Sequence, residues 1–219
     1  MKNNPWQDIT PGDYDAHMSH PNVAQTQMLS RITKEQFGLL PQAQIPNAYV
    51  AILGITNGNG LEHIVSLGIK KVIGIDINEA FLNECRTRFS QIESRLDLFQ
   101  LDLTTDTAKS IEILSNCDLI IANLLIKHIR LENFMKIIAG LPKRSQIVSC
   151  VIQINPDGEA LSKSGFEYVF DGVSKQRESE NESLIISSMA ENGFNITNRI
   201  VYDLPNGKQF IRLDFVAVI

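Results

Sequence analysis

Cysteine is scarce in this chain, with three residues among 219. The three, Cys85, Cys117 and Cys150, are odd in number and widely spaced, and each lies in a segment whose pattern predicts a helix or a strand. A disulfide framework, which needs paired cysteines in a secreted chain, is therefore not expected. A metal site would need closer spacing with histidine nearby, so no metal is predicted. We interpret all three cysteines as reduced core residues.

Long hydrophobic runs and basic runs are also missing. No apolar stretch approaches the roughly 18–20 residues that a membrane span needs, and residues 1–8, Met-Lys-Asn-Asn-Pro-Trp-Gln-Asp, have no apolar signal-peptide core. The net charge is −5 at pH 7, which argues against a groove that binds nucleic acid by neutralising phosphates. We expect a cytoplasmic protein with neither a membrane nor a nucleic acid as its partner.

What the chain does contain is a glycine-rich turn between apolar runs. Residues 48–60, Ala-Tyr-Val-Ala-Ile-Leu-Gly-Ile-Thr-Asn-Gly-Asn-Gly, pass from an apolar run to this turn, and a helix pattern follows. A second apolar run, Lys71–Ile75, ends at Asp76. This order favours a nucleoside cofactor, with the helix N-terminus and close backbone on one side and a carboxylate facing the ribose hydroxyls on the other.

Strand-like and helix-like segments alternate from Ala48 onward. The predicted strands are 49–53, 71–76, 96–101, 117–123, 146–154, 194–204 and 208–219. The predicted helices are 23–37, 61–67, 107–114, 131–139 and 184–190, together with a helix capped by Asn78 whose apolar residues recur every three or four positions at Phe81, Cys85, Phe89, Ile92 and Leu96. Alternation predicts parallel strands with helices on both faces, and Pro205-Asn206-Gly207 predicts a terminal hairpin. The expected fold class is α/β: a doubly wound, mostly parallel, Rossmann-like sheet of seven strands that ends in an antiparallel hairpin.

From residue 48 to residue 219 this arrangement resembles the class I S-adenosylmethionine-dependent methyltransferases. In that family the first loop usually reads acid-x-Gly-x-Gly-x-Gly, and Gly54 and Gly58 match its first and third glycines while Gly60 opens the helix. Ile52 stands where the acid is common, and Thr56 stands where the middle glycine is common. Because a β-branched residue does not easily take a positive φ, we expect the turn to curve differently near Thr56.

The resemblance implies S-adenosyl-L-methionine as cofactor, with S-adenosyl-L-homocysteine as product. It implies that Asp76 accepts bonds from both ribose hydroxyls, that Ile77 packs on the adenine, and that Asp102 and the backbone of Leu103 meet the adenine edge. The full set of predicted cofactor-binding residues is Gly54, Ile55, Thr56, Asn57, Gly58, Asn59, Gly60, Asp76, Ile77, Asp102, Leu103, Asn123 and Leu124.

Two parts of the chain lie outside the regular alternation. Residues 1–47 are predicted to form an N-terminal helical cap or lid, and residues 48–219 the S-adenosylmethionine-binding methyltransferase domain. Residues 155–182 make a long connection, which we interpret as a cover on the substrate side. Within it, Gly165–Phe170 alternates like a short strand.

An activated methyl donor needs mostly alignment with its acceptor, and no unmistakable general base is evident. Tyr14, His17 and His128 are the candidate catalytic residues, and a small-molecule acceptor is favoured. Alternatives stay open: a cofactor-binding module that has lost catalysis, an RNA or protein methyltransferase, or an NAD(P)-dependent oxidoreductase. The oligomeric state is not indicated.

Overall fold

The computed structural model describes residues 4–142, 146–155, 161–175, 180–205 and 207–218. Its strands are β1 (Tyr49–Leu53), β2 (Lys71–Asp76), β3 (Leu96–Gln100), β4 (Leu119–Asn123), β5 (Ile147–Ile154), β6 (Phe194–Asp203) and β7 (Gln209–Ala217). Its α-helices are α1 (Pro11–Met18), α2 (Gln25–Phe37), α3 (Ile64–Leu67), α4 (Glu79–Arg88), α5 (Thr107–Leu114), α6 (Ile126–Ile129), α7 (Leu131–Gly140), α8 (Asp171–Ser174) and α9 (Glu182–Glu191). Its 3-10 helices are η1 (Pro5–Asp8), η2 (Ile45–Asn47), η3 (Leu61–His63), η4 (Ser90–Arg95) and η5 (Glu167–Phe170).

The strands form one seven-stranded sheet in the order β3-β2-β1-β4-β5-β7-β6. Neighbouring strands from β3 to β5 run parallel, and β7 runs antiparallel to both β5 and β6. This confirms the predicted fold class, because apolar runs buried on both faces favour parallel pairing in the interior of a sheet. The predicted hairpin turn contains Asn206, which lies outside the described residues.

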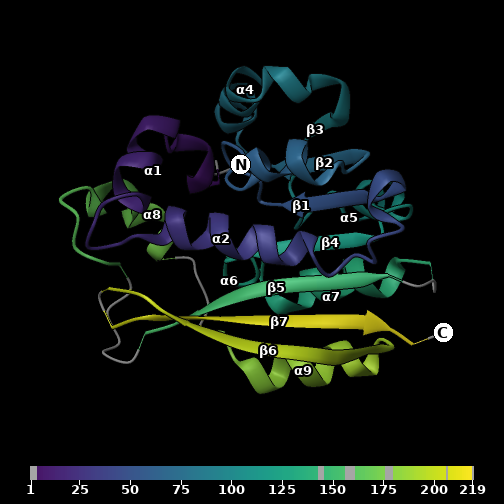
Figure 1. The fold of residues 1–219 in the computed structure, drawn as a ribbon. Coiled ribbons are helices and arrows are strands. Elements are labelled where there is room, and N and C mark those ends of the chain that lie inside the picture. Colours follow the sequence, from purple (N-terminus) through teal and green to yellow (C-terminus); the bar gives the residue numbers. More distant parts are fainter. Residues whose placement is uncertain (1–3, 143–145, 156–160, 176–179, 206, 219) are drawn as a thin grey trace.

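Two apolar clusters cover the two faces of the sheet. On one face, Phe134 and Ile137 of α7 and Met189 of α9 pack with Leu114 of α5 against the strands. On the other face, side chains of α2, α3 and α4 fill the space, and Figure 1 displays α2 lying across the strands there. Helices therefore lie on both faces, and the carboxyl ends of the parallel strands meet at one edge.

A third apolar cluster lies at that edge and joins segments far apart in the sequence. Tyr14 of α1, Phe81 of α4, Phe170 of η5 and Phe210 of β7 all belong to it. Figure 1 places α1 and α8 together at one end of the sheet. The N-terminal segment and residues 161–174 therefore share one small core. The division into domains at residue 47 stays a prediction.

Two details differ from the sequence prediction. Gly165–Phe170 does not form a strand: Gly165 has φ 86°, and a 3-10 helix begins at Glu167. The Glu167 carboxylate accepts hydrogen bonds from the N–H groups of Ser164 and Gly165, which turns the chain back on itself. The apolar periodicity after Asn78 also overestimates the helix, because α4 ends at Arg88 and a 3-10 segment follows.

The three cysteines are buried and none is in a disulfide, and their burial confirms that they are core residues. Among the helices that the structure describes, none combines the length and the apolarity needed to cross a bilayer.

Candidate active site

A cavity of about 170 Å³ opens at the carboxyl ends of β1, β2, β3 and β4. Its floor includes Leu53 at the end of β1, Asp76 at the end of β2, Asp102 just after β3 and Asn123 at the end of β4. Its other walls come from the N-terminal segment and from residues 161–174. An open α/β sheet binds its ligands at this edge, so the cavity lies where the sequence pattern predicted it.

The turn after β1 forms one wall of the cavity. Gly54 has φ 67°, and a Cβ atom there would approach Leu125 Cδ1 to 3.1 Å, so glycine suits this position. Ile52 also lines the cavity, which gives this wall an apolar side chain in place of the family's usual acid. In this turn a ligand could therefore approach the backbone closely, but it would find no carboxylate there.

Thr56 overturns one expectation about this turn. Its φ is 50°, so the β-branched residue does adopt the left-handed conformation that we expected the turn to avoid. The Thr56 N–H donates to Asp76 Oδ2 at 2.9 Å, and the Gly58 N–H closes the turn on the Ile55 carbonyl at 3.0 Å. Two hydrogen bonds thus hold a conformation that costs about 1–2 kcal/mol for a residue other than glycine.

Asp76 is an ionisable residue of the cavity whose pKa is raised. Its side chain is buried, its Oδ2 accepts from Thr56 and its Oδ1 accepts from the Asn78 N–H at 2.9 Å. Burial raises the pKa of the Asp76 carboxyl to about 6, and backbone N–H bonds from Asn78, Thr56 and Ile77 oppose that rise. Ionised at pH 7, this carboxylate can accept further hydrogen bonds from hydroxyl groups of a ligand.

Three predicted cofactor residues lie outside the cavity wall. A Cβ atom at Gly58 would come within 3.0 Å of three core side chains, and one at Gly60 would come to 2.5 Å from Thr33 Cγ2. Asn57 is buried, and its Nδ2 donates to Asp15 Oδ1 at 2.7 Å. These residues pack the loop against α1, α2 and α4, so their local role is to fix its shape.

The remaining predicted cofactor residues line the cavity. Ile77, Asp102 and Leu103 do so at the ends of β2 and β3, together with Ile55, Thr56, Asn59 and Leu124. Asp102 Oδ1 already accepts from the N–H of Thr104 at 2.8 Å and from its hydroxyl at 2.6 Å. Asp102 thus caps its own loop and retains Oδ2 for other partners.

Asn123 is held by a side chain that sequence reasoning missed. Gln36 Nε2 donates to Asn123 Oδ1 at 2.8 Å, and Asn123 Nδ2 donates back to Gln36 Oε1 at 2.9 Å. Gln36 is fully buried and also donates to Ser149 Oγ at 2.8 Å. Helix α2 therefore supports the floor of the cavity from below.

The three candidate catalytic residues all line the cavity. His17 Nδ1 lies 2.7 Å from Ser164 Oγ, and burial lowers the pKa of His17. Burial raises the pKa of Tyr14 above its ordinary range, although a hydrogen bond with Thr56 opposes this. His17 is therefore neutral near pH 7, and Tyr14 keeps its proton. Residues of α1 and α6, which are distant in sequence, line the same cavity, and their catalytic role stays a prediction.

No known family profile matches the chain. Over 100 residues it is 36% identical to the ribosomal protein L11 methyltransferase of Aquifex aeolicus, a stretch that covers 45% of this chain and 36% of that protein. The solved magnesium protoporphyrin IX methyltransferase of Synechocystis, with bound S-adenosylmethionine, superposes with a TM-score of 0.60 at 16% identity, over 88% of this chain and 79% of that one.

The Burkholderia thailandensis 1,6-didemethyltoxoflavin-N1-methyltransferase superposes with a TM-score of 0.61 at 12% identity, over 100% of this chain and 92% of that one. The chain has the class I S-adenosylmethionine-dependent methyltransferase fold. The predicted family resemblance is confirmed at the level of the fold.

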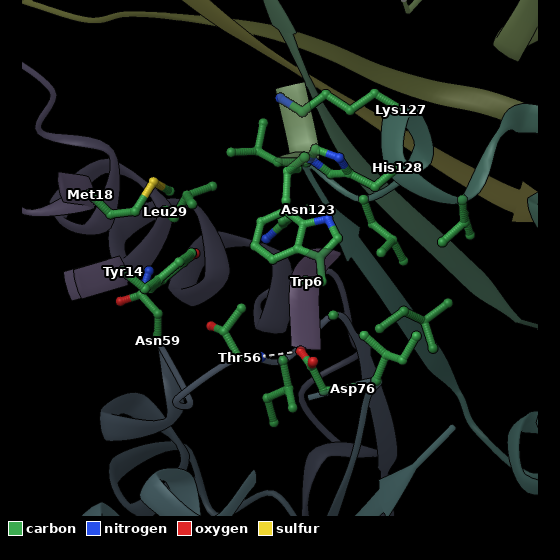
Figure 2. A pocket seen from close by; sticks show the side chains of 18 of the residues that line it. Trp6, Tyr14, Met18, Leu29, Thr56, Asn59, Asp76, Asn123, Lys127 and His128 are labelled. Carbon is green, nitrogen blue, oxygen red and sulfur yellow. Dashed lines mark hydrogen bonds between the residues drawn. The ribbon is translucent and has the colours of Figure 1, made fainter. Parts of the chain in front are cut away.

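Within this methyltransferase fold, the N-terminal segment adds residues that were not predicted as part of the site. Trp6 lines the cavity and meets the His128 ring at 82°, with ring centroids 4.8 Å apart. Asn78 Nδ2 donates to the Trp6 and Ile9 carbonyls, both at 2.8 Å, which ties the segment to the start of α4. Figure 2 displays the Trp6 indole between Asp76 on one side and Asn123 and His128 on the other.

One sequence signal could have predicted helix α1 within this segment. Thr10 precedes Pro11, and Asp13 follows two residues later; Thr10 Oγ1 accepts from the Asp13 N–H at 3.1 Å and caps α1. A capping threonine followed by proline at the first helical position is a helix start signal. It would have placed α1, which carries Tyr14 and His17.

Proposed function

We propose that this protein is an S-adenosylmethionine-dependent methyltransferase. The observation that carries the proposal is the Asp76 carboxylate, buried at the end of β2, aimed at a cavity and bonded to the turn after β1. Carboxyl groups whose pKa is raised, as burial raises that of Asp76 to about 6, are typical of functional sites when they line a cavity. Two adjacent ribose hydroxyls are donors that this carboxylate can satisfy.

The residues of the cavity fit the donor that the fold implies. Asp76 would hold the ribose, and Ile77 would lie against the adenine face. Asp102 and Leu103 would meet the adenine edge, and the backbone of the turn that begins at Gly54 would approach the amino-acid end. Asn123 and Leu124 would line the crevice for methyl transfer. All of these residues lie on the cavity wall, which supports their assignment.

When bound, S-adenosylmethionine would supply a methyl group activated by its sulfonium: the acceptor's lone pair would form the new bond to carbon, and the electron pair of the broken carbon–sulfur bond would stay on sulfur. The protein's own contribution is alignment and exclusion of water. Trp6 and Phe170, whose rings are in contact, line the cavity and would limit the access of water to a bound donor. Holding two reactants in contact can lower the barrier by about 7–11 kcal/mol at best.

His17 is the side chain that best suits proton removal from the acceptor. Its Nδ1 is fixed by Ser164, so with the proton on Nδ1 the Nε2 atom carries a lone pair and can take a proton. Burial lowers the pKa of His17, which keeps the imidazole neutral near pH 7. Tyr14, whose pKa is raised, serves better as a hydrogen-bond donor.

A small-molecule acceptor is the main proposal, because Trp6, Phe170 and side chains of α1 line the cavity, and because two structurally similar enzymes are named for small-molecule acceptors. A protein acceptor is the second candidate, favoured by the 36% identity to a ribosomal protein methyltransferase. An oxidoreductase is disfavoured because β7 is inserted antiparallel between β5 and β6, whereas the dinucleotide-binding order continues from strand five to strand six.

Calorimetric titration with S-adenosylhomocysteine and, separately, with NAD⁺ tests the proposal. We expect saturable binding of S-adenosylhomocysteine and no binding of NAD⁺. Binding of NAD⁺ without binding of S-adenosylhomocysteine would refute the proposed methyltransferase function and favour the oxidoreductase alternative. Tight S-adenosylmethionine binding with no S-adenosylhomocysteine formed on any acceptor would instead identify a cofactor-binding module that has lost catalysis.

A further inference from the structure

Aromatic rings from four elements gather on one side of the cavity. Trp6 comes from η1, His17 from α1, His128 from α6 and Phe170 from η5, and all four line the cavity. The ring centroids of Trp6 and Phe170 are 6.3 Å apart, and those of His17 and Phe170 are 4.7 Å apart. Because these four residues are far apart in the sequence, it is the tertiary fold that brings them together. We call the four rings the ring wall.

The rings of this wall meet at steep angles. Trp6 is inclined by 82° to His128 and by 74° to Phe170, and His17 is inclined by 47° to Phe170. In none of these pairs does one ring cover the face of another in parallel. A flat guest can therefore stack on one ring face while it meets the neighbouring rings at their edges, an arrangement that aromatic groups prefer.

The charges of the cavity are placed on its other side. Among the described residues that line it, the carboxylates are Asp76 and Asp102, which belong to the ends of β2 and β3 and are assigned to the donor. Figure 2 displays Asp76 across the Trp6 indole from His128 and Lys127. Among the described residues that line the cavity, a cationic acceptor would thus find no carboxylate besides the two assigned to the donor, and an ammonium ion removed from water needs such a partner.

We propose that the methyl acceptor is an uncharged, planar aromatic compound that stacks on the wall formed by the rings of Trp6, His17, His128 and Phe170. This inference rests on the proposed function and narrows its acceptor. An acceptor that enters the cavity as an ammonium ion is disfavoured by the same reasoning. Non-planar acceptors of equal size could not stack on the ring wall and should bind more weakly.

Three probes of matched size test this acceptor class on the protein saturated with S-adenosylhomocysteine. They are 2-naphthol (planar and uncharged), 2-naphthylmethylammonium (planar and cationic) and decahydro-2-naphthol (uncharged and non-planar). By calorimetry we expect 2-naphthol to bind at least about tenfold more tightly than either of the others. Because Trp6 is the single tryptophan of the chain, its indole N–H resonance in a ¹⁵N-correlated NMR spectrum should shift when 2-naphthol binds.

A pair of variants locates the probe. Phe170→Leu should weaken 2-naphthol binding by about tenfold while S-adenosylhomocysteine affinity is kept. Tyr168→Leu is the matched control, since Tyr168 belongs to the same 3-10 helix but is 66% exposed; it should leave both affinities unchanged. Retained S-adenosylhomocysteine affinity also verifies that each variant is folded.

The outcomes separate this inference from the proposed function. If S-adenosylhomocysteine binds but 2-naphthol does not, or if the cation or the non-planar alcohol binds as tightly, the aromatic acceptor is refuted and the methyltransferase stands. If S-adenosylhomocysteine itself fails to bind, both proposals fail together.

Discussion

Lowering the pH from 7 to 5 should weaken the binding of an adenosine ligand to this protein by about tenfold. The cause is the Asp76 carboxyl, whose pKa burial raises to about 6. Ribose hydroxyls need the ionised form as acceptor, so the apparent dissociation constant scales with one plus the ratio of protonated to ionised carboxyl. That factor is about 1.1 at pH 7 and about 11 at pH 5. A carboxyl with the ordinary value of 3.8 would change it by less than about 10% over the same interval.

Calorimetry with methylthioadenosine suits this measurement, because that ligand keeps the ribose and adenine and lacks the ionisable amino-acid group. His17 also lines the cavity and its pKa is lowered, so its titration must be separated from that of Asp76. The Asp76→Asn variant is the matched control: it keeps His17 and loses the carboxylate, and its weaker affinity should stay flat between pH 5 and pH 7. A wild-type affinity that is equally flat would refute the assignment of the raised pKa to a ribose-binding acid.

Three further substitutions test other parts of the account. His17→Gln should lower the turnover number by about 10²–10⁴, measured as S-adenosylhomocysteine release, and leave S-adenosylhomocysteine affinity intact; unchanged turnover would exclude His17 as the base. Gln36→Leu should leave the Asn123 amide without its reciprocal partner and destabilise the fold by about 1–3 kcal/mol in urea unfolding; an unchanged midpoint would contradict this. Gly60→Ala combines φ 92° with a 2.5 Å approach to Thr33, so we expect a loss of about 2 kcal/mol or more and a melting temperature lower by roughly 4–8 °C; full stability would mean that the loop readily rearranges.

The sheet and the donor side of the cavity could be predicted because they follow from local patterns. Continuous apolar runs predict buried parallel strands, and a strand's last residue lies at the ligand-binding edge whatever the rest of the chain does. Asp76 and Asp102 were located in this way, from their places directly after such runs. The terminal hairpin was predicted by the alternation on both sides of Pro205-Asn206-Gly207.

The acceptor side depends on contacts that no local pattern reports. Gln36 and Asn123 are 87 residues apart, and His17 and Ser164 are 147 residues apart. The segment of Phe170 resembles a short strand because apolar and polar residues alternate in it. In the structure, the Glu167 carboxylate accepts hydrogen bonds from the two N–H groups of Ser164 and Gly165, and a 3-10 helix begins at Glu167. Local preference was overridden there by capping and packing.

Thr56 illustrates the same limit at a single residue. Its intrinsic preference is against positive φ, and that preference led to the wrong expectation for the turn. The bond from its N–H to Asp76 joins residues 20 apart and holds the left-handed conformation. The acid that is proposed to bind the ribose also shapes the loop that faces it.

The affinity of Asp76→Ala for S-adenosylhomocysteine, measured by calorimetry at pH 7.5, tests the central claim most directly. Loss of two hydrogen bonds to a charged acceptor, at about 1.5–3 kcal/mol each, should weaken binding by roughly 100-fold or more. Asp97→Ala is the control, because that carboxylate lies on neighbouring β3, paired at the surface with Lys71, and should leave the affinity unchanged. Wild-type affinity in the folded Asp76→Ala protein would contradict the account.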